Sequence, residues 1–142
     1  MTDESIELIR KASTGWRLMK LTTVFNNVMK DELEAINLTK DQFSILMTLL
    51  ENDGIKQKQI SERAQLPEYS VTRGLNALDK EGFTIRDKSE ESRRCFAIRL
   101  TEKGQKIQPT FINIIEKVNS RLLKNLTLEE SKIFDAVLLK LT

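Results

Sequence analysis

The first quarter of the chain carries apolar residues at a helical spacing. Between Ser5 and Ile36 there is no proline, and Gly15 is the only glycine. A helix of about thirty residues would be roughly 45 Å long, which is more than one small domain covers. We therefore expect a single helix over 5–36, with part of its apolar face covered by a partner chain. The apolar residues recur every three or four positions: Ile6, Ile9, Trp16, Met19, Val24, Phe25, Val28, Leu33 and Ile36.

The next predicted element is a short apolar helix with a signal at each end. Thr39 and Gln42 form a capping-box pattern, in which the threonine hydroxyl accepts an amide and the glutamine reaches back. Apolar residues follow at helical spacing as far as Leu50. The sequence Asn52-Asp53-Gly54 then ends the helix, because glycine adopts the left-handed turn at little cost.

Two more short helices follow, and a proline separates them. The first covers residues 56–65, with Ile60 and Ala64 on one face. Pro67 divides the two helices, because proline disfavours helical geometry in the residue before it and fits the first turn of a new helix. The second helix has apolar residues spaced by four and three positions: Val71, Leu75 and Leu78.

The pattern then changes from a helical period to alternation. Residues 83–86 and 96–100 alternate apolar and polar side chains, which is typical of half-buried strands. Every residue from Asp87 to Arg94 is polar or charged. Alternation on both sides of such a segment predicts a β-hairpin with a charged tip.

Two helices are expected to close the chain. One begins near Thr101, with a kink at Pro109, and the other opens with a second capping box at Thr127 and Glu130. Since no repeat or linker divides the chain, we expect one domain over 1–142, mainly α with a small β-hairpin (α+β). The apolar residues of the two helices keep the helical spacing: Ile107, Phe111, Ile114, Ile115, Val118, Leu122, Ile133, Phe134, Val137, Leu138 and Leu141.

Composition removes several classes of chemistry. The 142 residues include no histidine and one cysteine, Cys95. No Ser-His or Cys-His couple can form, and no imidazole can bind a metal or shuttle protons near neutral pH. One cysteine builds neither a zinc cage nor an internal disulfide. We therefore expect no enzyme, no metal and no cofactor, although composition alone leaves an all-carboxylate metal site open.

Charge and hydropathy indicate the compartment and hint at a partner. No run of 18 apolar residues is present, and the acidic start lacks the basic segment of a signal peptide. A lone cysteine fits a reducing interior, so a soluble, cytoplasmic protein without membrane contact is expected. The net charge is +2, but residues 54–104 hold eleven Lys and Arg against eight Asp and Glu. This central basic excess is compatible with nucleic acid as a partner.

The order of helix, short turn, helix and charged-tip hairpin is that of a winged helix-turn-helix. In that motif the second helix lies in a DNA major groove, and the wing meets an adjacent groove or the backbone.

Four segments stand out within that order, the last being the most specific: Gln59-Ile-Ser-Glu-Arg-Ala-Gln-Leu66, Val71-Thr72-Arg73, Leu78-Asp-Lys-Glu-Gly82-Phe83 and Arg94…Leu100-Thr101-Glu-Lys-Gly104. On these residues the chain resembles the MarR family of bacterial transcriptional regulators, most densely over about fifty residues. The resemblance implies a homodimer in which helices 5–36 and 101–142 interlock, while two winged lobes, 39–100, reach one palindromic operator in double-stranded DNA. It also implies that the protein is a repressor.

The candidate DNA contacts lie on the second helix and on the wing. Arg73 suits guanine or phosphate, and Asn76 suits adenine. Tyr69, Ser70 and Thr72 suit phosphate oxygens or a thymine methyl group. The alternative interpretation is that each of these side chains lies on a solvent-facing side of the helix and contacts no DNA. The wing candidates are Lys88, Arg93 and Arg94, of which the last stands where the family carries its minor-groove arginine, and weaker phosphate candidates precede them: Lys56, Lys58 and Arg63.

Several residues depart from the family pattern. Ser92 stands where an aspartate usually supports the wing arginine, and Pro67 stands where a serine usually caps the recognition helix. Glu68 brings a negative charge to the entry of that helix, and Glu90 and Glu91 dilute the wing. These residues keep a second function open, namely a winged-helix protein-interaction module that has lost DNA binding.

The resemblance further implies a small aromatic or anionic effector bound beside the dimer helices. The residues that could line such a pocket are equally explained as core packing. Cys95 is more easily explained as incidental than as a redox switch, although neighbouring arginines would favour its thiolate. The pocket candidates are Trp16, Met19, Phe43, Met47 and Phe111.

Overall fold

A computed structural model describes residues 3–88 and 96–142. The chain divides into two compact units. We call the part up to Glu32 and from Ile115 onward the helical unit, and Leu33–Ile114 the winged unit.

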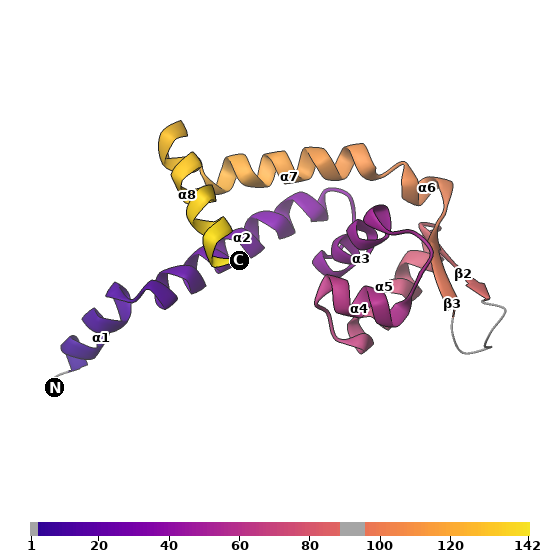
Figure 1. The fold of residues 1–142 in the computed structure, drawn as a ribbon, viewed down its shortest axis with the longest axis horizontal. Helices are drawn as coiled ribbons and strands as arrows, with labels where there is room; N and C mark the ends of the chain where they lie inside the picture. Colours follow the sequence, from indigo (N-terminus) through magenta and orange to yellow (C-terminus); the bar gives the residue numbers. More distant parts are fainter. Residues whose placement is uncertain (1–2, 89–95) are drawn as a thin grey trace. The chain divides into compact units, whose positions relative to one another are not determined.

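The helical unit contains α1 (Asp3–Ala12), most of α2 (Thr14–Glu34), the second half of α7 (Gln108–Leu122) and α8 (Leu128–Leu141) (Figure 1). Arg121 joins α7 to α2 through Asp31 and Glu32, at 3.1 and 3.4 Å. The capping box expected at Thr127 is confirmed, because its hydroxyl accepts from the Glu130 amide at 3.1 Å and Glu130 Oε1 accepts from the Thr127 amide at 2.9 Å.

The expectation of one helix over 5–36 is wrong, because Ser13 separates α1 from α2. The Ser13 amide donates to the carbonyl of Arg10 at 3.1 Å, which closes a tight last turn on α1. Serine, threonine and glycine follow one another here, and all three are weak helix formers. The guanidinium of Arg10 lies 4.6 Å from the centre of the Trp16 ring and spans the break.

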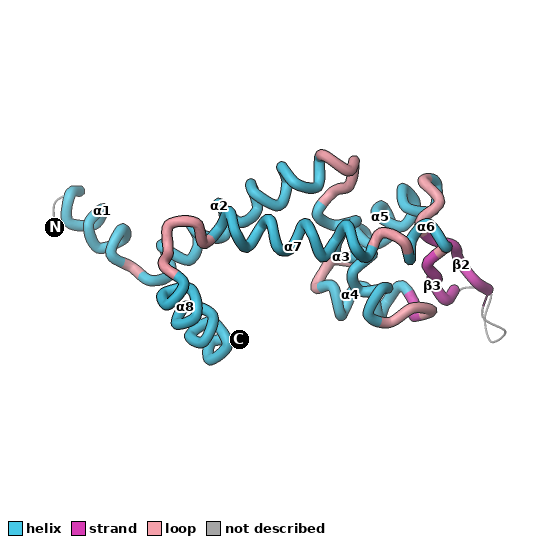
Figure 2. Tube along the Cα trace, turned by 90° about the horizontal axis from the view of Figure 1, so that it is seen from above, coloured by secondary structure: helices cyan, strands magenta, loops and turns pink. Residues whose placement is uncertain are grey.

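The winged unit places three helices beside a small antiparallel sheet (Figure 1). The helices are α3 (Lys40–Glu51), α4 (Gln57–Ala64) and α5 (Glu68–Lys80), followed by the single turn α6 (Glu102–Gln105). The strands are β1 (Ile55–Lys56), β2 (Thr84–Lys88) and β3 (Phe96–Leu100), in the order β1-β3-β2. Figure 2 shows β2 and β3 together as the wing hairpin. The predicted mainly helical fold with a hairpin wing is confirmed.

One side of each helix in the winged unit forms its core. The predicted spacing on α5 is confirmed, since Val71, Leu75 and Leu78 are buried. They share the core with residues from four other elements: Ile45, Leu46, Leu49, Ile60, Ile98 and Phe111. The capping box at Thr39 and Gln42 is also present and starts α3.

Two local expectations near the wing need correction. β1 was not predicted, and it exists because Ile55 pairs with Ile98 of β3. The expected kinked helix from Thr101 is instead two helices, since α6 ends at Gln105 and α7 begins at Gln108. Pro109 therefore lies in the first turn of α7, where an amide would have no helical partner.

Candidate nucleic-acid interface

Helix α5 presents one exposed face. Tyr69, Arg73, Asn76 and Lys80 are spaced by four, three and four residues, so they form a line along the helix. All four are exposed, and Tyr69 is 70% accessible to solvent. The opposite face is buried through Val71, Gly74, Leu75 and Leu78. We call the four exposed residues the outward stripe.

Gly74 explains how closely α5 packs on α3. A Cβ added at this position would overlap Ile45 Cδ1, and Ile45 is fully buried. The atom that approaches Gly74 so closely belongs to a side chain and not to the backbone. This packing fixes the face that α5 turns away from the core.

The hydroxyl of Thr72 is already engaged beside the stripe. Thr72 Oγ1 donates to the carbonyl of Glu68 at 3.0 Å and accepts from Gln57 Nε2 at 2.5 Å. A hydroxyl has one proton to donate, so Thr72 has none left for a phosphate oxygen, and its methyl group is the part suited to a base edge. Ser70 is half-buried. Together with Arg73 it lines a hollow of about 290 Å³, completed by Thr39, Asp41, Gln42, Gly74 and Ala77.

The cations of the winged unit divide into two groups. Arg86 pairs with Asp79, Arg99 with Asp87 and Lys106 with Glu102, at 3.3, 2.6 and 2.9 Å. A second group makes no ion pair with any residue that the structure describes. It includes the weaker phosphate candidates Lys56, Lys58 and Arg63, and also Arg73 and Lys80 of the outward stripe. The cations suited to contacting phosphates are therefore concentrated on α4, on Lys56 just before it and on the outward stripe.

Part of the predicted wing site falls outside the described residues. Arg93 and Arg94 lie there, as do Cys95 and the departures at Glu90, Glu91 and Ser92. The backbone of Lys88 ends β2 and pairs with Phe96.

A chain of polar contacts connects α5 to the wing. Thr84 Oγ1 donates to Asp79 Oδ1 at 2.5 Å, and Arg86 Nε lies 3.3 Å from Asp79 Oδ2. Arg86 Nη2 then donates to Asn76 Oδ1 at 2.7 Å. The recognition residue Asn76 is thus attached to β2 and is not an independent side chain.

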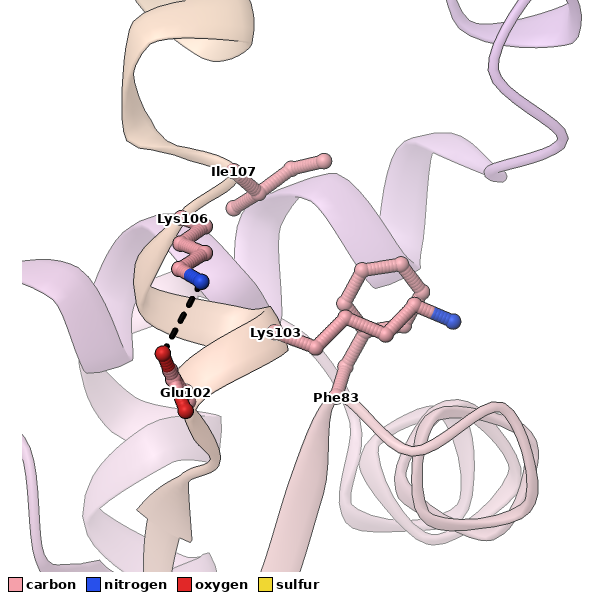
Figure 3. A pocket seen from close by; sticks show the side chains of 5 residues that line it. All are labelled: Phe83, Glu102, Lys103, Lys106 and Ile107. Carbon is pink, nitrogen blue, oxygen red and sulfur yellow. Dashed lines mark ion pairs between the residues drawn. The ribbon is translucent and has the colours of Figure 1, made fainter.

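A second hollow, of about 470 Å³, lies where α6 meets the end of α5 (Figure 3). Lys103 Nζ donates to the carbonyl of Glu81 at 2.6 Å and lies 4.4 Å from the centre of the Phe83 ring. Lys106 pairs with Glu102, and Ile107 completes the lining. Figure 3 shows the two ammonium groups pointing in different directions, so they do not form a cradle for one anion.

The structure brings together two of the five effector candidates. The rings of Phe43 and Phe111 lie 4.6 Å apart at 46°, and Phe111 is fully buried, which is core packing. Met47 is half-buried in the same unit. In the helical unit Trp16 is half-buried against Arg10, and Met19 is exposed. None of the five lines either hollow described above.

Sequence reasoning missed Lys80 and Arg86. Lys80 was not among the predicted DNA contacts, although it lies eleven residues beyond Tyr69 and therefore on the same face of the helix. Arg86 gave no local signal, because its partners Asn76 and Asp79 lie on another element. The described residues contain no cluster of metal-binding side chains, and no helix among them is long and apolar enough to cross a membrane.

Comparison with known proteins identifies the family. The model of the MarR family matches residues 38–96. The transcriptional regulator SarZ of Staphylococcus epidermidis is 30% identical over 102 residues, covering 72% of this chain and 68% of SarZ. An uncharacterized transcriptional regulator of Bacillus subtilis, YybA, is 25% identical over 118 residues, covering 83% and 79% of the two chains.

Solved structures agree with this assignment. A putative MarR family regulator from Listeria monocytogenes, crystallised with a 26mer DNA, has a TM-score of 0.74 and 25% identity, covering 91% of this chain and 86% of that one. A MarR family protein of Mycobacterium tuberculosis in complex with salicylic acid has a TM-score of 0.76 and 23% identity, with coverages of 92% and 97%. SarZ, YybA and the Listeria protein are transcriptional regulators. The chain belongs to the MarR family of transcriptional regulators.

Proposed function

We propose that this regulator is a dimeric, sequence-specific DNA-binding repressor whose two winged units bind one palindromic operator. The observation that carries the proposal is the outward stripe on α5. Four exposed side chains stand on one face of a helix anchored by a buried face, and two of them, Arg73 and Lys80, are cations without an ion pair among the described residues. A helix of this kind fits the B-DNA major groove.

Each residue of the proposed interface has a chemical role. Arg73 donates to guanine or to a phosphate, and Asn76 contacts a base edge. Tyr69, Ser70 and Lys80 contact phosphates, while Thr72 offers its methyl group to thymine. In the wing, Lys88, Arg93 and Arg94 contact the backbone or the minor groove, where a narrow A-tract attracts cations. The Listeria structure with DNA supports this assignment by likeness.

Exposed apolar residues of the helical unit support the dimer. Helix α8 has no fully buried residue in the single chain, and its Phe134 and Leu138 are half-buried. Isolated exposed apolar residues are ordinary, but a concentration of them marks an association surface. We assign residues 5–36 and 101–142 to dimerisation and 39–100 to DNA binding. The exposed apolar residues of α1, α2 and α8 are Ile6, Leu8, Ile9, Leu18, Met19, Val24, Leu128, Ile133, Val137, Leu139 and Leu141.

Selection of DNA fragments retained by the protein, followed by fluorescence anisotropy over a salt series, tests DNA binding. We expect operator affinity to fall steeply with salt, because several phosphates are neutralised together. Lys80→Ala is expected to weaken binding to every sequence alike and to reduce the salt slope by about 1. Lys106→Ala, which removes an exposed cation paired with Glu102, is the matched control and should change affinity less than twofold. If no fragment is retained at low salt, the protein-interaction alternative replaces this proposal.

We also assign a small aromatic anion as effector, with Trp16 and Met19 of the helical unit as its candidate contacts. The salicylic acid complex of the Mycobacterium relative supports the ligand class. Salicylate is expected to raise the unfolding temperature with concentration and to weaken operator binding, whereas neutral salicylamide should do neither. Met19→Ala, at an exposed position, should lower salicylate affinity without loss of folding. Unchanged unfolding and unchanged operator binding in salicylate would contradict this assignment.

A further inference from the structure

The hydrogen bond between Arg86 and Asn76 has a consequence for base reading. The side chains that lead to it become more exposed step by step from the core outward. Thr84 is 1% exposed, the side chains of Asp79 and Arg86 are 29% and 34% exposed, and Asn76 is exposed. The buried threonine orients the carboxylate, and the carboxylate orients the guanidinium. The exposed asparagine is thus held by a series of contacts anchored in the core.

The contact also determines which way the amide of Asn76 is turned. A guanidinium carries only donors, so the atom that it meets must be the amide oxygen and not the amide nitrogen. With Oδ1 held by Arg86 at 2.7 Å, the Nδ2 hydrogens face away from that arginine. They make no hydrogen bond to any residue within 3–88 or 96–142. Asn76 therefore presents a donor.

We propose that Arg86 is a positioning residue that makes Asn76 read a hydrogen-bond acceptor on a base edge, with purine N7 as its target. This inference rests on the proposed DNA-binding function. Both purines place N7 in the major groove, whereas cytosine presents the N4 donor there. Without Arg86 the amide is free to turn its oxygen outward and accept from cytosine. Arg86 thus selects a base edge that offers an acceptor, and rejects cytosine, at one operator position without touching DNA.

A series of operators tests this, with each purine of a half-site replaced in turn by its 7-deaza analogue, which has C–H in place of N7. We expect one position at which the analogue weakens wild-type binding roughly tenfold, the loss typical of one specific base contact. Arg86→Lys keeps the charge but loses the planar fork that bridges two partners. It should weaken binding of the purine operator by about the same factor, tolerate cytosine at that position, and leave the salt slope unchanged.

Arg99→Lys is the matched control, because Arg99 is an exposed wing arginine paired at 2.6 Å with Asp87, which is not on α5. It should change affinity less than twofold. In an Asn76→Ala background, Arg86→Lys should cause no further loss, since its only route to the base is gone. Asn76→Asp keeps a partner for Arg86 but has no N–H donor, so it should fold normally and lose sensitivity to the 7-deaza substitution.

Two results would overturn the inference. One is an equal loss for Arg86→Lys with and without Asn76, which would show that Arg86 does not act through the asparagine. The other is a uniform loss on all operators with a smaller salt slope, which is the behaviour of a direct phosphate contact. Both results require that wild-type protein binds an operator, so they are distinct from failure of the proposed function itself.

Discussion

Gly104→Ala is expected to lower the free energy of unfolding by about 3 kcal/mol, which combines overpacking with a lost hydrogen bond. A Cβ at this position would overlap the carbonyl oxygen of Phe83 and lie 3.0 Å from Leu100 Cδ2. The carbonyl cannot move away freely, because it accepts from the Thr101 amide at 3.0 Å, while the Thr101 hydroxyl donates to the neighbouring carbonyl of Gly82 at 2.6 Å. The substitution therefore disrupts the packing of α6 against β3 and against the segment that follows α5.

Two other glycines give graded controls for Gly104→Ala. Gly82 has φ of +82° but no atom within 4 Å of an added Cβ, so Gly82→Ala carries backbone strain alone, about 1–2 kcal/mol. Gly15, in the first turn of α2, has only Ser13 Oγ nearby at 3.7 Å, and Gly15→Ala should be neutral or stabilising by up to about 1 kcal/mol. Urea unfolding at one fixed protein concentration measures all three. Gly104→Ala unfolding no more easily than Gly82→Ala would contradict the packing argument.

The elements that sequence predicted well are those whose causes are local. Thr39 and Thr127 each start a helix through a partner three residues later, so both capping boxes could be recognised in four residues. The spacing of Val71, Leu75 and Leu78 likewise defines the buried face of α5 without knowledge of what covers it. Tyr69, Arg73 and Asn76 were placed on the exposed face by the same geometry.

The elements that sequence did not predict depend on distant partners. A strand of two residues has no alternation to detect, and β1 forms only because Ile55 meets Ile98. Asp53 was taken as part of a helix stop, but its Oδ1 also accepts from the Leu100 amide at 2.8 Å, across 47 residues of sequence. The break at Ser13 has a different cause. The helical spacing of apolar residues continues across it, and this spacing favoured one helix despite three consecutive weak helix formers.

The same division applies to the candidate interface. The exposure of the outward stripe could be predicted from the periodicity. Whether each polar group is free to form a hydrogen bond with DNA could not. Thr72 is exposed, yet its hydroxyl already donates its proton to the carbonyl of Glu68. A helical wheel does not show this bond. Asn76 is exposed and yet is oriented by a wing residue. A recognition helix can therefore be located from sequence, while the direction in which its side chains donate and accept requires the fold.

Ile133→Glu is expected to convert the proposed dimer into a monomer and to weaken binding of the full operator by about a hundredfold or more, because two linked half-site contacts become independent. Ile133, Val137 and Leu141 lie four residues apart on α8 and are 59%, 46% and 70% exposed in the single chain. A carboxylate within a surface that these residues bury would lose its hydration without a partner. Sedimentation velocity and operator anisotropy measure the two effects.

Two comparisons make the result of Ile133→Glu specific. Ile85→Glu introduces the same carboxylate at an isoleucine that is 50% exposed in β2, outside the helical unit, and it should sediment as wild type. Binding of a single half-site should be the same for Ile133→Glu and wild type, because the winged unit is untouched. A variant that remains dimeric would show that α8 does not form the interface. A variant that becomes monomeric but loses half-site binding as well would show that the helical unit shapes the recognition surface itself, rather than only bringing two copies together.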